Sequence, residues 1–307
     1  MKLLLLVPAF ALIGLAVHDL FHTLFHPAGR GAVSDRVSRF VWRIFRSIST
    51  PHNGYITLAG PVAILAIMAM WVILSVFGFA LLYYPFIATQ FALASGLDPQ
   101  LHKSFTDAFN VSLGTLVTVG GDFNAKSKLI RFAMGIEATL GFGLLTASVS
   151  WLLSIYPALE RRRTLAHEAT LLHFAEENTG YRIEELPPSE SQSVLWGFAA
   201  SMASCRNDLT QFPVIYYFRS GDSQSGFSGT LSYFAELAES ASRSGRDPSI
   251  RMAGIALGGA LDDYLEFIAD AYLRMSTHDK EAIMRCYAAE HLRPLMQSSR
   301  RPLRRAG

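Results

Sequence analysis

Residues 101–124 read LHKSFTDAFNVSLGTLVTVGGDFN and set the interpretation of the whole chain. The pattern of 101–117 predicts a helix of about four turns, too short to cross roughly 30 Å of bilayer hydrocarbon. An extended segment rich in Thr, Val and Gly follows at once, and at membrane depth its backbone groups need a water-lined cavity. With a turn at 96–99 before it and Ser127 able to cap the next helix, this order predicts a re-entrant loop between two membrane spans.

The segments on either side of this stretch are almost free of charge. No Lys, Arg, Asp or Glu occurs between Arg46 and Asp98, and only Glu137 interrupts the stretch from Arg131 to Glu160. Only 17% of the 307 residues are charged, against about a quarter in ordinary soluble domains, which argues against a fully soluble protein. We therefore predict spans at about 56–85 and 129–156, and a first span at about 3–25.

Basic residues predict the topology. Five arginines follow the first span and three follow the last, so the positive-inside rule places both stretches in the cytoplasm. A cleaved signal peptide, the alternative for the first segment, would leave the five arginines outside. The prediction is a multi-pass protein of the inner (plasma) membrane with its N-terminus outside and its C-terminal half in the cytoplasm. The arginines are Arg30, Arg36, Arg39, Arg43 and Arg46, then Arg161, Arg162 and Arg163.

Three parts follow from this pattern. Residues 1–55 form the first span and a basic connector, 56–163 the membrane unit with the re-entrant loop, and 164–307 a cytoplasmic helical domain. In the connector, apolar residues recur at helical spacing over 37–48, which favours an amphipathic helix on the inner membrane surface over a solvated linker.

Residues 112–122, SLGTLVTVGGD, resemble the pore helix and selectivity filter of potassium channels, whose members read S-x-x-T-x-x-T-V-G-Y-G-D or close to it. The likeness covers about residues 10–165 and is to bacterial ion-channel-like proteins with one extra span before the two-helix pore unit. It implies an all-α membrane protein that forms a homotetramer. It also implies that carbonyl oxygens of Thr118, Val119, Gly120 and Gly121 bind a permeant monovalent cation, K⁺ or Na⁺, with no other cofactor.

The filter departs from the pattern because its tyrosine is absent. Either one residue is deleted, or Gly121 stands at the tyrosine and Asp122 at the final glycine. Fewer fixed carbonyl rings should weaken discrimination against sodium. Lys126, Lys128 and Arg131 also outnumber Asp122 near the outer mouth, and either repel cations or point away from the axis. A non-conducting scaffold or sensor that acts through its cytoplasmic domain is the alternative function.

Polar residues and glycines in the third span suggest supporting roles. Glu137 is expected either to accept a hydrogen bond from Ser112 or Thr115 and so support the pore helix, or to be a protonated structural residue. Gly141 and Gly143 could form a gating bend, although small residues in spans more often allow close helix packing.

Three histidines near the end of the first span share one helix face with Asp19. His18, His22 and His26 could bind a metal ion or sense protons, but a structural site needs four fixed ligands and Pro27 ends the helix. We therefore predict no metal, and an ion pair from Asp19 to one of the arginines.

The remaining sequence has the composition of a water-facing helical domain with one core. Residues 164–307 carry 14 basic and 18 acidic side chains, and neither cysteine there, Cys205 or Cys286, has a metal-site or CxxC spacing. No nucleotide fingerprint and no nucleophile, base and oxyanion constellation occur, so we predict no enzyme, and the domain's ligand is not identified. The net charge of only +2 implies no nucleic-acid partner. Pro157 is expected to end the third span, and the helices expected beyond it are 164–178, 189–205, 207–219, 228–243, 248–275 and 278–297.

Overall fold

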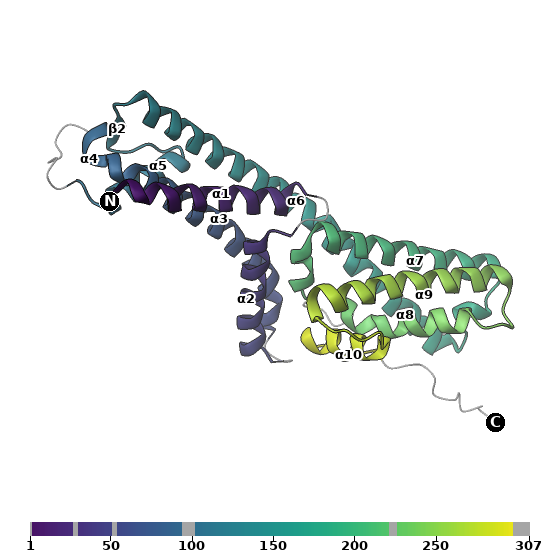
Figure 1. Ribbon diagram of the computed structural model, residues 1–307. Coiled ribbons are helices and arrows are strands. Elements are labelled where there is room, and N and C mark those ends of the chain that lie inside the picture. The colour runs from purple at the N-terminus through teal and green to yellow at the C-terminus, as the bar shows by residue number, and fades with distance from the viewer. Residues whose placement is uncertain (1, 27–29, 51–53, 94–101, 221–225, 297–307) are drawn as a thin grey trace. The chain divides into compact units, whose positions relative to one another are not determined.

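A computed structural model describes the chain except residues 1, 27–29, 51–53, 94–101, 221–225 and 297–307. It divides into two compact units, each discontinuous in sequence (Figure 1). The first unit is Met1–Arg39 with Ala63–Ser154, and the second is Phe40–Val62 with Ile155–Gly307. This division differs from the predicted one, because part of the connector belongs to the second unit.

Three helical segments are long and apolar enough to cross a membrane, as the sequence predicts. The first is α1 (Leu6–Leu24), which follows the 3₁₀ turn η1 (Lys2–Leu5). The second runs from η2 (Tyr55–Leu58) through α3 (Ala59–Tyr83) and η3 (Tyr84–Phe86) to α4 (Ile87–Gln90). The third is α6 (Lys128–Thr179). Along α1 and α6 many large apolar side chains are exposed, which suits contact with lipid.

A short helix and two short strands connect α4 to α6. These are β1 (Phe91–Leu93), α5 (Phe105–Leu116) and β2 (Phe123–Ala125), and β1 pairs antiparallel with β2 so that Phe91 faces Ala125. The all-α prediction missed these strands, because three residues are too few to show alternation. The turn expected at 96–99, and the first residue of the helix expected at 101–117, lie outside the described residues.

The core of the first unit surrounds α5. Buried side chains from α3, α4, β1, α5, β2 and α6 form one cluster, in which Tyr83 is completely buried. The cluster consists of Phe79, Tyr83, Ile87, Phe91, Ala108, Val111, Ala125 and Ile130. Helix α5 is therefore held against both flanking spans (Figure 1).

Asp19 joins α1 to the start of α2 (Ala32–Ile48). Its buried carboxylate accepts hydrogen bonds from the backbone N–H of Val33 at 2.7 Å, the backbone N–H and hydroxyl of Ser34, and the indole N–H of Trp71 at 3.0 Å. We expected an arginine partner, whereas these donors belong to a helix N-terminus and an indole. Asp19 thus stabilises the N-terminus of α2 from a neighbouring helix.

Helices build the second unit. They are the second half of α2, η2 with the start of α3, the end of α6, α7 (Pro188–Gln211), α8 (Phe227–Ala241), α9 (Pro248–Ile268) and α10 (Lys280–Glu290). The short turns η4 (Ile183–Glu185), η5 (Pro213–Tyr217) and η6 (Ala269–Leu273) connect them. One predicted boundary is wrong, because α7 continues through Arg206 to Gln211 as a single helix. Cys205 and Cys286 are free thiols, as expected, and burial raises the pKa of Cys205 to about 12.

Pro157 is expected to end the third membrane span, but the helix itself does not end there, because α6 runs on to Thr179. A proline lacks the N–H of the helix ladder and its ring crowds the carbonyl four residues earlier, a cost of about 3 kcal/mol. Packing offsets this cost, since Ile155, Ala158 and Leu159 around it are almost completely buried. The helix expected separately at 164–178 is therefore the continuation of α6.

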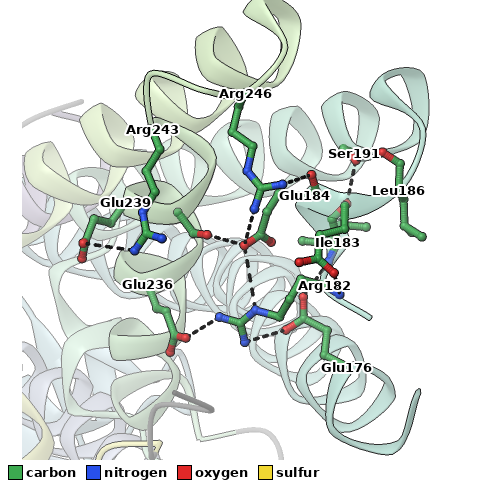
Figure 2. A network of polar contacts seen from close by, with 12 residues as sticks. Glu176, Arg182, Ile183, Glu184, Leu186, Ser191, Glu236, Glu239, Arg243 and Arg246 are labelled. Atoms are coloured by element: carbon green, nitrogen blue, oxygen red, sulfur yellow. Dashed lines mark hydrogen bonds and ion pairs between the residues drawn. The ribbon is translucent and has the colours of Figure 1, made fainter. Parts of the chain in front are cut away.

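An ion-pair network ties the end of α6 to η4 and α8 within the second unit (Figure 2). The guanidinium of Arg182 lies 2.5 Å from Glu236 and 3.8 Å from both Glu176 and Glu184, and Arg246 lies 3.7 Å from Glu184. The three glutamates are buried, and burial raises the pKa of Glu176. Removal of Arg182 would take a counter-charge away from these buried carboxylates, of which Glu184 would keep Arg246.

Candidate functional site

The start of α5 is fixed by a reciprocal cap. The hydroxyl of Ser104 accepts a hydrogen bond from the backbone N–H of Asp107 at 3.3 Å, and the Asp107 carboxylate accepts one from the Ser104 backbone N–H at 2.8 Å. His102 Nδ1 lies 3.1 Å from the same carboxylate. The S-x-x-D pattern is a sequence signal for this start that our prediction of 101 overlooked.

The end of α5 is a Schellman turn formed by the predicted filter residues. The backbone N–H of Thr118 donates to the carbonyl of Thr115, and that of Val119 to the carbonyl of Gly114, both at 3.0 Å. Thr118 has a φ of +59° and Gly120 one of +78°. The left-handed region suits glycine but is costly for a β-branched threonine, so the chain holds backbone strain at Thr118.

The loop that follows is exposed in the single chain. All five predicted filter residues, Thr118 to Asp122, are exposed in the single chain, and Val119 is 82% exposed. Within the described part of the chain, no hydrogen bond reaches the carbonyl oxygens of residues 118–121. The loop also lies at the C-terminus of α5, the negative end of the helix dipole. Carbonyl oxygens in this setting favour a cation over an anion.

Buried hydrogen bonds hold α5 against both spans. Glu137 of α6 is 0% exposed and accepts hydrogen bonds from the hydroxyls of Ser112 and, at 2.8 Å, Tyr83. The Ser112 hydroxyl also lies 3.0 Å from the carbonyl of Val76. The expected contact from Ser112 is thus present, whereas the second donor is Tyr83 rather than Thr115, which is buried nearby. Tyr83 was missed because it is distant in sequence and nothing in its local pattern marks it.

Two glycines allow the backbone to approach closely. A Cβ on Gly141 would lie 1.9 Å from the carbonyl oxygen of Leu116, and one on Gly114 would lie 2.4 Å from that of Gly120. By contrast, nothing lies within 4 Å of a Cβ placed on Gly143. The packing interpretation therefore fits Gly141, and it finds no support at Gly143.

Charged side chains and a cavity surround the loop. Arg131 Nε donates to the carbonyl of Ala125 at 2.8 Å, while Asp122, Lys126 and Lys128 are exposed. A cavity of about 460 Å³ lies beside the loop. Its lining includes His102, Asp107, Asn110, Thr115, Gly121 and Met134.

The rings of His18 and His22 in α1 and of His26 just beyond it lie next to one another. The ring centroids of His18 and His22 are 4.3 Å apart, and those of His22 and His26 are 5.2 Å apart. Among the described residues, no group of three or more His, Cys, Asp or Glu side chains is arranged to hold a metal ion.

Comparison with known proteins gives one informative match. No family model matches the chain, and no solved structure matches it. The chain is similar to the uncharacterized membrane protein YdjJ of Bacillus subtilis (strain 168), with 26% identity over 157 residues. The match covers 50% of this chain and 44% of YdjJ, less than half of that protein's length. Together with the three long apolar helices, it supports a membrane location.

Proposed function

We propose that this protein is a cation channel of the potassium-channel type, in which four copies bring their loops 118–122 to a common axis. The observation that carries the proposal is the exposed loop of residues 118–121, whose carbonyl oxygens accept no hydrogen bond from the described residues. Such oxygens can replace the hydration shell of K⁺ or Na⁺. No covalent chemistry and no resident cofactor are involved.

The surroundings of the loop support this role. Glu137, Ser112 and Tyr83 hold the helix that precedes the loop, and Gly141 allows its last turn to contact α6 directly. The exposed Val119 at the loop tip would lie against neighbouring copies in the proposed tetramer. The cavity beside the loop is consistent with the missing filter tyrosine, so we expect weak discrimination between K⁺ and Na⁺.

The proposed orientation follows the distribution of arginines. The N-terminus lies outside, the second unit lies in the cytoplasm, and the membrane is the inner (plasma) membrane. The cytoplasmic helices would assemble or regulate the tetramer, and the amphipathic part of α2 would lie along the membrane surface.

A second candidate function is a non-conducting scaffold or sensor. The observation that favours it is the closure of the loop onto α5, since the backbone N–H of Gly120 also donates to the carbonyl of Gly114 at 3.1 Å. A loop that caps its own helix presents its carbonyl oxygens less regularly than an extended filter does.

Flux through liposomes that contain the purified oligomer tests the proposal. Gly120→Ala and Gly180→Ala form a matched pair, because both glycines have a positive φ (+78° and +74°) and open space around a Cβ. Each change strains the backbone by about 1–2 kcal/mol, but only Gly120 lies in the loop. We expect K⁺ and Na⁺ flux from the wild type and from G180A, and a large loss in G120A. Absence of flux from a folded wild-type oligomer would favour the scaffold.

Insertion of Tyr between Gly120 and Gly121 tests the proposed filter alignment. If the missing tyrosine is what lowers selectivity, the insertion should raise the ratio of K⁺ to Na⁺ flux above that of the wild type. An unchanged ratio in a conducting variant would contradict this explanation of selectivity.

A further inference from the structure

The part of α6 that belongs to the second unit has two distinct faces. One face is buried in its own unit, where Leu165, Ala166 and Ala169 are each at most 1% exposed. The other face, here termed the heptad face, is exposed and consists of Thr164, His167, Leu171, Phe174 and Asn178. Its members follow one another at alternating steps of three and four residues. This alternation is the repeat by which helices pack into coiled coils.

Two large apolar side chains lie exposed on the heptad face. Leu171 is 53% exposed, and Phe174, one turn further along, is 63% exposed. Isolated apolar residues on a surface are ordinary, but neighbours at successive core positions of a heptad are what helix packing buries. Asn178 takes the next core position, where a buried asparagine fixes the register of the helices. The heptad face therefore has the residues of a contact between helices.

The charges beside the heptad face match a parallel pair of helices. With Leu171 at heptad position a, Arg163 takes position g and Glu168 takes position e of the following heptad. These two positions form the ion pairs between neighbouring helices of a parallel coiled coil. Arg163 and Glu168 are exposed, and within the described part of the chain neither forms an ion pair. Since residues five apart lie on different sides of one helix, their opposite charges meet between helices rather than within one.

Insertion in a membrane fixes the direction of this helix in a second copy. Helix α6 runs without a break from Lys128 to Thr179 and is one of the three helices that are long and apolar enough to cross a membrane. Copies with the same topology present this helix in the same direction. A second copy of the chain therefore offers the heptad face in the parallel orientation that Arg163 and Glu168 require.

We propose that the heptad face of α6 packs against the same face of neighbouring copies in a parallel, in-register helical bundle. In this bundle Leu171 and Phe174 are buried, and Arg163 pairs with Glu168 of the neighbouring copy. The number of helices, four, rests on the proposed function. The contact between copies does not depend on whether the loop conducts ions.

Disulfide trapping of the full-length protein in lipid vesicles tests the contact. Cys286→Ser removes the more accessible native thiol, and the buried Cys205 is kept. Leu171→Cys then places a thiol on the heptad face, and Ala203→Cys places one at an exposed position of α7 as the matched control. Under mild oxidation we expect L171C to form disulfide-linked dimers at least about tenfold faster than A203C, because its thiols are held together.

Charge reversal then tests the register. In the L171C protein, Arg163→Glu or Glu168→Arg alone puts like charges opposite one another, and each should slow the formation of dimers about threefold or more. R163E and E168R together restore the attraction and should restore the rate. Arg285→Glu, which reverses an exposed charge paired with Glu281 in α10, makes the same change in net charge and should leave the rate unaltered.

Three results would overturn the proposal: equal rates in L171C and A203C, a rate that R163E does not lower, and a double reversal that does not recover it. Ion flux through the same vesicles separates this inference from the proposed function. Flux without trapping at L171C would exclude the bundle and leave the channel standing. Trapping with recovery in the double reversal, but without flux, would support the bundle and count against the channel.

Discussion

Replacement of Gly141 by alanine should displace α5 and disable the loop that follows it. The added Cβ would lie 1.9 Å from the carbonyl oxygen of Leu116, the last residue of α5, whereas ordinary contact begins at 3.4 Å. The two backbones must therefore separate by about 1.5 Å. Such overpacking costs about 1–3 kcal/mol, while alanine recovers up to about 1 kcal/mol of helix propensity. Because Thr118 is only two residues further along, the displacement reaches the carbonyl oxygens of the loop.

Gly143→Ala is the matched control, since it lies on the same helix and nothing is within 4 Å of its Cβ. We expect G141A to lower the melting temperature of the detergent-solubilised protein by several degrees and to abolish flux. G143A should retain both. Trp71 and Trp151 of the first unit, whose ring centroids are 5.9 Å apart, provide the fluorescence signal for unfolding. Equal stability and equal flux in the two variants would refute the packing argument.

The remaining predictions concern buried polar groups. Glu137→Leu should cost about 1–3 kcal/mol of stability, measured by thermal unfolding, because the Tyr83 hydroxyl loses its acceptor. Asp19→Ala should cost about 2 kcal/mol and speed hydrogen exchange at the Ser34 amide, which loses its side-chain acceptor. Burial lowers the pKa of His291 from 6.5 to about 4, so the folded state binds its proton less readily than the unfolded state. Stability of the second unit should therefore fall by up to about 3 kcal/mol as the pH drops from 6.5 to 4, measured by hydrogen exchange in α10.

Each of these predictions has a control. Glu137→Gln keeps a hydrogen-bond donor and acceptor at this position, so its stability should stay near that of the wild type. Adding Y83F to E137L removes the unpaired hydroxyl and should restore part of the stability that E137L loses. Asp35→Ala removes another acid of α2, whose carboxylate pairs with Arg39. This change should leave the hydrogen-exchange rate of the Ser34 amide as it is in the wild type. His291→Gln should remove the pH dependence between 6.5 and 4. A wild-type slope retained in that variant would assign the titration to another group.

The three long apolar helices, and the short helix and loop between the last two of them, could be predicted from the sequence because their signals are local. A run of apolar residues without charge determines a span, and a half-length helix before a Thr and Gly segment indicates that the chain turns back. The contact between Ser112 and Glu137 was also predictable, since an acid inside a span requires a buried partner and few polar residues were available.

Features that depend on tertiary packing could not be predicted in this way. Tyr83 reaches Glu137 across 54 residues, and Pro157 is tolerated only because its neighbours are buried. The left-handed Thr118 contradicts the backbone preference of threonine, so local rules predict a different turn.

The arrangement of the loops in the purified oligomer tests the central claim most directly. A cryo-electron microscopy map of the protein in potassium-containing buffer should show four copies around one axis. The loops 118–122 should face that axis, with density for ions between their carbonyl oxygens. A dimer, or an oligomer whose loops face lipid, would contradict the channel assignment.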